Sequence, residues 1–139
     1  VYGIMMDVNC FKEINDTYGH AEGDRAIQEI GHILSGALVA NSVAIRMSGD
    51  EFMVLIRHGS KELLNKTCAA IEQRVQHYNA TAPAGSFQLS FSTGVAKYEG
   101  GSVEKFLVEL DQRMYAEKRA FHAARDGHAV PEQGNAPSI

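Results

Sequence analysis

Three acidic residues are placed where their carboxylates could bind a metal ion. Asp7 closes the apolar run 1–8, and Asp50 and Glu51 occupy the turn of a predicted hairpin over 43–56. If that hairpin lies beside the first strand, the carboxylates converge. Because like charges repel at short range, a divalent cation would be their usual partner. The two aspartates also have simpler explanations, since Asp50 is of a type common in turns and Asp7 could cap the following helix. Spacing alone leaves both interpretations open.

Hydrophobic spacing predicts the elements that would hold these acids. Apolar runs and alternating patterns indicate strands, whereas apolar residues three and four apart indicate helices. Helices interleaved with a hairpin and two other strands are typical of an α+β sandwich with a largely antiparallel central sheet. In chain order we expect a strand over 1–8, a helix over 9–18, a helix that starts at Gly23–Asp24, strands over 43–47 and 52–56, a helix around Leu64–Tyr78, a loop over 79–86, a strand over 87–98, a helix over 103–121 and a short strand over 128–130.

The size and composition of the chain fit a single folded domain. Its 139 residues are 45% hydrophobic and 22% charged, which suffices for one core. The formal net charge of −4 disfavours a protein that grips the nucleic-acid backbone. No apolar stretch approaches the roughly 20 residues that cross a bilayer. Cys10 and Cys68 form no metal-binding or disulfide pattern, which favours reduced thiols in the cytosol. We expect one domain over 1–130 and a disordered tail over 131–139.

Four sequence motifs, in matching order and spacing, resemble the GGDEF family of diguanylate cyclases. The string DVNCFKEINDTYGHAEGD at 7–24 is similar to the family's first strand and the segment after it, and RMSGDEF at 46–52 is similar to its signature hairpin. FSTGVA at 91–96 resembles the family's SIGIA strand, and LDQRMYAEK at 110–118 resembles its AD..MY.AK helix. The resemblance implies the palm-type, ferredoxin-like α+β fold of nucleotidyl cyclases.

The resemblance implies a metal-dependent nucleotidyltransferase site. Asp7, the backbone carbonyl of Val8 and Asp50 would coordinate Mg²⁺ or Mn²⁺. Glu51 would help bind the metal and assist deprotonation of the attacking 3′-hydroxyl, so Asp50 and Glu51 are the candidate catalytic residues. The activity would join two GTP molecules into cyclic di-GMP with release of pyrophosphate. Tyr115, in the last motif, is interpreted as a core residue.

The same resemblance implies which residues would bind GTP. Asn15 and Asp24 would hydrogen-bond the guanine edge, since a carboxylate can accept from N1 and N2 donors that adenine does not offer as a pair. Lys12 and Lys118 would meet the triphosphate as point charges. The amides around Phe11, at a helix N-terminus, would seat a phosphate. The complete candidate GTP-binding set is Phe11, Lys12, Asn15, Asp24, Ser48, Gly49 and Lys118.

Several positions depart from the family pattern. Ser48 replaces the first glycine of the signature, which is a small change, and Asn9 replaces the second acid after the first strand. His122 replaces an arginine of the last helix, with Arg119 and Arg125 nearby as candidate substitutes.

The product-inhibition pair of the family is also replaced. Val39 and Ser42 stand where the arginine and aspartate of an RxxD motif would be. Neither side chain can bind a phosphodiester or guanine as that pair does, so we expect no inhibitory product site. In the family a helix usually precedes the first strand, connects a sensory domain and aids dimerisation; we expect this chain to lack that helix.

The favoured interpretation is an enzyme of bacterial second-messenger signalling that works as a homodimer, with one GTP in each copy. An upstream sensory domain and a cytoplasmic location are implied, with the chain either free or part of a membrane-anchored receptor. No nucleic-acid partner and no membrane segment are expected. The alternative is a catalytically silent GTP-binding module that regulates a neighbouring domain, which Ser48 and His122 favour and the intact acids disfavour. A cyclase with another product is disfavoured by Asn15 and Asp24.

Overall fold

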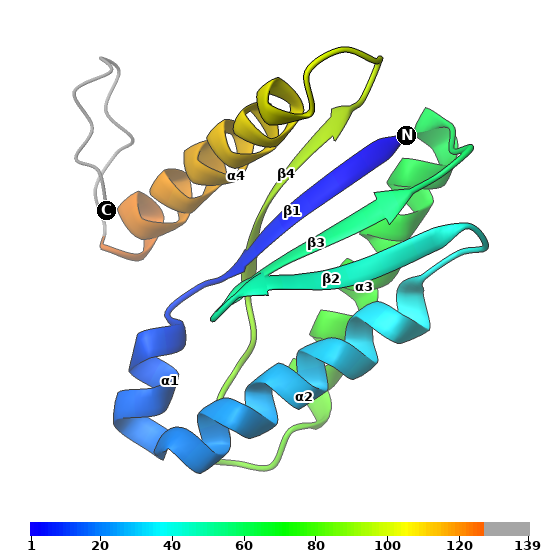
Figure 1. Cartoon of the computed structure of the whole chain (residues 1–139). Coiled ribbons are helices and arrows are strands. Elements are labelled where there is room, and N and C mark those ends of the chain that lie inside the picture. The colour runs from blue at the N-terminus through cyan, green and yellow to red at the C-terminus, as the bar shows by residue number, and fades with distance from the viewer. Residues whose placement is uncertain (127–139) are drawn as a thin grey trace.

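A central antiparallel sheet organises the protein (Figure 1). The computed structural model describes residues 1–126, so the strand expected at 128–130 and the tail expected at 131–139 lie outside the described residues. The elements are β1 (Tyr2–Val8), α1 (Phe11–Tyr18), α2 (His20–Ala37), β2 (Ser42–Ser48), β3 (Glu51–Ile56), α3 (Lys61–Thr81), β4 (Phe91–Lys97) and α4 (Val103–Arg125). The strands pair in the order β2-β3-β1-β4, with α2 and α3 on one face and α4 on the other. Among the described residues, no helix has the length and apolar character that spanning a membrane would require.

The strand β1 lies inside the sheet and carries Asp7 to the turn of the hairpin. It pairs antiparallel with β3 on one side and with β4 on the other. Asp7 stands opposite Glu51 in β3 and opposite Ser92 in β4. The hairpin therefore lies beside the first strand, which is the arrangement that convergence of the acids requires.

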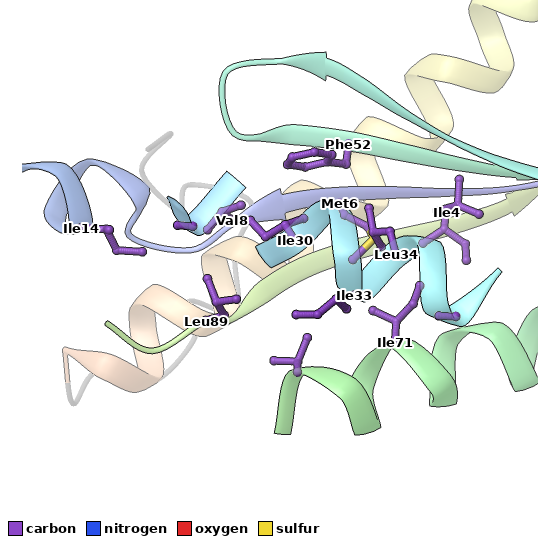
Figure 2. Packing of buried hydrophobic residues seen from close by; sticks show 14 of the residues in the cluster. Ile4, Met6, Val8, Ile14, Ile30, Ile33, Leu34, Phe52, Ile71 and Leu89 are labelled. Carbon is purple, nitrogen blue, oxygen red and sulfur yellow. The ribbon is translucent and has the colours of Figure 1, made fainter. Parts of the chain in front are cut away.

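The face of the sheet toward α2 and α3 buries the larger hydrophobic core (Figure 2). Because strand side chains alternate between the two faces, Ile4 and Met6 of β1 both point to this side. Ile30 and Leu34 of α2 are at most 1% exposed, and Ile71 of α3 closes the layer. Burial of this apolar surface supplies the main hydrophobic stabilisation of the fold.

The helix α4 approaches the other face closely because a glycine makes room for it. A side chain at Gly94 of β4 would collide with the backbone of α4 at Leu110 and Met114. The cluster on this side is smaller and rich in methionine. Tyr115 is 41% exposed, so its interpretation as a core residue is wrong. It follows Met114 directly, and neighbouring helical residues point in different directions.

The start of α2 differs from the sequence expectation. The helix begins at His20, directly after Gly19, whose φ of 92° makes the turn from α1 within one residue. Asp24 therefore lies in the second turn of α2 rather than at its first residue.

The segment before β4 is held by a side chain instead of a strand ladder. The pattern predicted a longer strand and a loop from Asn79, but α3 continues to Thr81 and β4 begins at Phe91. Asn79 accepts from the Leu89 amide at 2.7 Å and donates to the Leu89 carbonyl at 2.8 Å. These bonds satisfy backbone groups that a neighbouring strand would otherwise pair. Buried Phe87 and Leu89 thus alternate as in a strand without belonging to one.

Candidate active site

Asp7 is a buried carboxylate of which only one oxygen has a hydrogen-bond partner among the described residues. Its side chain is 10% exposed, and Lys118 of α4 donates to its Oδ2 atom at 2.5 Å. The Oδ1 atom is buried and has no hydrogen-bond partner among the described residues. A buried carboxylate oxygen without a partner is costly. Asp7 is therefore a candidate for binding a ligand rather than a contributor to stability.

The hairpin brings Asp50 and Glu51 to the same end of the sheet. The Val8 amide donates to the Asp50 carbonyl at 3.0 Å, which joins the hairpin turn to the end of β1. Burial raises the pKa of Asp7; the hydrogen bond from Lys118 lowers it, and the charge of Asp50 raises it further. Burial, followed by the charges of neighbouring carboxylates, raises the pKa of Glu51. Both pKa shifts arise because several acidic groups lie close together in a partly buried site.

The chemistry of these groups fits a divalent metal ion. Carboxylate and carbonyl oxygens are the hard ligands that Mg²⁺ and Mn²⁺ take, and Oδ1 of Asp7 is a ligand atom without another partner among residues 1–126. As they stand, the described side chains include no group of three His, Cys, Asp or Glu residues able to hold a metal ion. A metal here would need further oxygens from a bound ligand, and Mg²⁺ commonly obtains these from phosphates.

The loop after β1 presents backbone amides beside these acids. Cys10 ends the loop with a φ of 59°, a left-handed conformation, and makes no capping bond to α1. The first amides of α1, from Phe11 on, are thus open to an anion. Asn9 fixes the loop, since it donates to Ser90 Oγ at 2.9 Å and accepts from Ser92 Oγ at 2.7 Å. The residue in the place of the family's second acid therefore has a structural role.

The side chain of Asn15 lies against the backbone of α2. Gly23 permits this approach, because a side chain at that position would collide with Asn15 Oδ1. The next residue along α2 is the exposed Asp24, so the two candidate guanine ligands are neighbours, with exposed Lys12 one turn earlier on α1. The sequence-predicted residues thus form three groups: Asp7, Val8, Asp50, Glu51 and Lys118 at the end of the sheet, Phe11, Lys12, Asn15 and Asp24 along α1 and α2, and Ser48, the last residue of β2, with Gly49 in the hairpin turn.

The family of the chain follows from its similarity to known proteins. The family model described as "Diguanylate cyclase, GGDEF domain" matches residues 1–123. The chain belongs to the GGDEF family. Diguanylate cyclase DosC of Escherichia coli (strain K12) is 30% identical over 118 residues, which are 84% of this chain and 26% of that protein. Diguanylate cyclase DgcS of Shewanella oneidensis is 32% identical over 116 residues, which are 83% of this chain and 38% of that protein. The chain thus spans less than half the length of either relative.

The arrangement of the sheet and helices agrees with a solved GGDEF domain. The crystal structure of the GGDEF domain of PA1120 (YfiN or TpbB) from Pseudomonas aeruginosa matches with a TM-score of 0.73 at 29% identity. The match covers 85% of this chain and 75% of that chain. The expectation of a palm-like nucleotidyl cyclase fold is confirmed.

The changed position in the GGDEF signature is tolerated by the hairpin. Arg46 donates to the Gly49 carbonyl at 3.0 Å through Nε and at 2.7 Å through Nη2, which closes the turn. A register shift between Arg46 and Ser48 marks a bulge in β2. Ser48 itself is exposed, so its side chain displaces nothing within the domain.

A second contact between α4 and the first loop was not predicted from the sequence. Arg125 Nη1 lies 2.7 Å from Glu13 Oε2 and 2.7 Å from Cys10 Sγ, so the end of α4 reaches the start of α1. His122 has a buried Nε2 atom without a partner among the described residues. Lys118, His122 and Arg125 are spaced four and three residues apart, which places basic side chains on one helix face. That spacing predicts which face of α4 is basic, but it does not identify Cys10 or Glu13 as the partners.

The two residues at the product-inhibition position bind each other. Ser42 Oγ donates to the Val39 carbonyl at 2.5 Å and thereby closes the turn before β2. Val39 and Ser42 are both half-buried. The segment is therefore organised as a local turn.

Proposed function

We propose that this chain is the catalytic domain of a diguanylate cyclase that condenses two GTP molecules into cyclic di-GMP. The observation that carries the proposal is the meeting of three acids and Lys118 beside the open N-terminus of α1. Acids that can hold a divalent metal, and donors that can hold phosphates, are the two requirements of phosphoryl transfer. Membership of the GGDEF family supports the same chemistry.

The acidic end of the sheet would supply the metal ligands and the base. Asp7, the carbonyl of Val8 and Asp50 would hold Mg²⁺ or Mn²⁺, with Glu51 beside them. When bound, the metal would neutralise charge that develops on the reacting phosphate. Glu51 faces Asp7 in the strand register, and we assign its carboxylate to accept the proton of the attacking 3′-hydroxyl.

The helical end would bind and select the nucleotide. The first amides of α1, with Lys12 and Lys118, would take the triphosphate through fixed dipoles and mobile charges. Asn15 and Asp24 would take the guanine edge, because an acceptor carboxylate matches its N1–H and N2–H donors. Gly49 in the hairpin turn would let the nucleotide approach the backbone closely.

The reaction requires two copies of the domain. The 3′-hydroxyl oxygen of one GTP attacks the α-phosphorus of the other, the bond from that phosphorus to the bridging oxygen breaks, and pyrophosphate leaves. The same step in the opposite direction closes the ring. Each chain offers one such set of residues, so we propose a homodimer with one GTP in each copy. In the full-length protein, an upstream sensory domain would control this encounter in the cytoplasm.

Incubation with GTP and Mg²⁺, followed by chromatographic separation of the products, tests the proposal. We expect cyclic di-GMP with two pyrophosphates for each molecule formed, and no cyclic product from ATP. The rate per domain should rise with protein concentration, because two loaded domains must meet. A flat specific activity across a wide dilution series, in a protein shown to be monomeric, would exclude the two-copy mechanism.

A catalytically silent GTP-binding module is the second candidate. The observation that favours it is His122, which stands where the family has an arginine and whose Nε2 atom is buried without a hydrogen-bond partner among the described residues. GTP binding measured by calorimetry, without any product at any protein concentration, would select this candidate over the cyclase.

A further inference from the structure

Lys118 already places a positive charge next to the acids at this end of the sheet. Its ammonium lies 2.5 Å from Asp7 Oδ2, and the two side chains are 17% and 10% exposed, so the ion pair is largely buried. Within residues 1–126, neither Asp50 nor Glu51 forms an ion pair of its own. The positive charge of Lys118 therefore offsets an excess of negative charge at this place.

A buried positive charge in this position competes with a metal ion. Oδ2 of Asp7 cannot bind an ammonium and a divalent cation fully at once, because two positive charges would then crowd one oxygen. Such repulsion is strong in partly dry surroundings. While Lys118 stays on Asp7, only the Oδ1 atom of that carboxylate is open to a metal.

We propose that Lys118 excludes free metal ions from these acids and admits a metal only together with a nucleoside triphosphate. The inference rests on the proposed function and makes Lys118 the residue that selects the metal–nucleotide complex over the free metal. A triphosphate offers the ammonium a new partner with several negative charges. Metal binding and nucleotide binding are then coupled through one side chain.

The exchange requires movement of the Lys118 side chain alone, because α4 is docked by other contacts. Glu117 accepts from the Thr93 amide at 3.0 Å, Met114 is buried against the sheet, and Arg125 binds Glu13. The flexible four-carbon stem of lysine allows its ammonium to leave Asp7 without a shift of the helix. The same contacts should keep α4 in place in Lys118 variants.

Binding of Mn²⁺ alone, without nucleotide, tests the proposal through calorimetry or the spin-resonance signal of free Mn²⁺. Lys118→Met removes the charge, and Lys118→Gln removes it but keeps a donor for Asp7 Oδ2. At mildly alkaline pH, both variants should bind Mn²⁺ roughly tenfold or more tightly than the parent. Lys105→Met makes the same substitution in the first turn of α4, about 20 Å along the helix. That control should leave Mn²⁺ affinity unchanged.

The coupling gives a second readout. GTP should tighten Mn²⁺ binding strongly in the parent and much less in Lys118→Met, where no ammonium has to be displaced. Mn²⁺ alone should also raise the melting temperature of the Lys118 variants more than that of the parent. Adding Asp7→Asn to Lys118→Met should remove the gain in affinity. An unchanged or weaker Mn²⁺ affinity in folded Lys118→Gln protein would overturn the proposal.

Failure of this proposal can be told apart from failure of the proposed function. A parent chain that binds GTP but forms no cyclic di-GMP loses its assignment as a cyclase, whereas the Mn²⁺ titrations still decide the role of Lys118. If the parent is active but its Lys118 variants bind Mn²⁺ no more tightly, the cyclase assignment stands. The proposal that Lys118 excludes free metal ions is then wrong.

Discussion

The face of the sheet against α2 and α3 and the face beneath α4 differ in the kind of group that they bury. On the first, Ile30 and Val54 have no exposed surface, and the buried hydroxyl of Thr67 donates to the Leu63 carbonyl at 2.9 Å. On the second, Asp7 is buried with one oxygen that has no partner among residues 1–126. The first face thus buries mainly apolar groups that contribute stability, whereas the second buries a carboxylate that Lys118 satisfies only in part.

The face beneath α4 is also less completely covered. The helix lies over β1 and β4 (Figure 1), and Val43, Ile45 and Met47 of the edge strand β2 are 49%, 37% and 41% exposed. Met5 and Met53 fill the covered part, and methionine packs into irregular spaces without a unique fit. The comparison indicates that stability and activity can be altered separately by substitutions on opposite faces.

The largest expected effect comes from Asp50→Ala on the charged side. Cyclase activity should fall about a hundredfold or more, because a proposed metal ligand is lost. The free energy of unfolding should change by less than about 0.5 kcal/mol or rise slightly, since Asp50 opposes the ionisation of Asp7. Initial rates with GTP and urea unfolding measure the two quantities. Glu72→Ala on the exposed side of α3 is the control, and full activity in Asp50→Ala would remove the metal assignment.

The opposite result is expected from Leu34→Ala on the apolar side. Leu34 is 1% exposed, and truncating it should lower the free energy of unfolding by about 2–5 kcal/mol. The turnover of the folded fraction should stay unchanged. Val108→Ala, at a residue that is 53% exposed, should cost less than about 0.5 kcal/mol. Equal losses in the two variants, measured by denaturant unfolding, would contradict the assignment of stability to the α2–α3 face.

Local sequence patterns predicted most of the fold, because burial on a sheet imposes simple periods. The apolar run of β1 is typical of a strand that is buried on both faces, and the helical spacing in α2 and α3 records which face of each helix is buried. The errors lie where a single contact overrides the pattern. Asn79 replaces a strand partner for Leu89, and the positive φ of Gly19 starts α2 earlier than the Gly23–Asp24 pair suggested.

The site was predictable only in part. The three acids could be placed together from the hairpin and the resemblance, and the structure does bring Glu51 opposite Asp7. The contacts from α4 could not be placed, because Lys118 and Asp7 are 111 residues apart and Arg125 and Glu13 are 112 apart. Such pairs depend on how a helix docks on the sheet, and no local spacing records that.

Two glycines of α2 are expected to affect GTP binding and stability separately, although they lie in the same helix. A side chain at Gly23 would collide with Asn15, whereas Gly31 has open space around it. Gly23→Ala should weaken GTP binding by about 1–3 kcal/mol, because Asn15 loses its position for the guanine edge. Gly31→Ala should leave GTP binding unchanged and raise the free energy of unfolding by about 0.5–1 kcal/mol. Calorimetry measures the GTP affinity of each variant, and thermal unfolding measures its stability. Equal GTP affinities in Gly23→Ala and the parent would exclude Asn15 from the pocket.

The smallest effect is expected at the turn before β2, which lies outside both the apolar core and the acidic site. Ser42→Ala removes the bond to the Val39 carbonyl and should lower the free energy of unfolding by about 0.5–1.5 kcal/mol. Binding of cyclic di-GMP should stay weak in the parent and in this variant, because neither residue offers a bidentate partner. The double variant Val39→Arg with Ser42→Asp supplies such a pair and should create tight product binding in calorimetry. Submicromolar binding to the parent that survives Val39→Asp would show that the product binds elsewhere, because an added carboxylate at residue 39 should repel a phosphodiester held there.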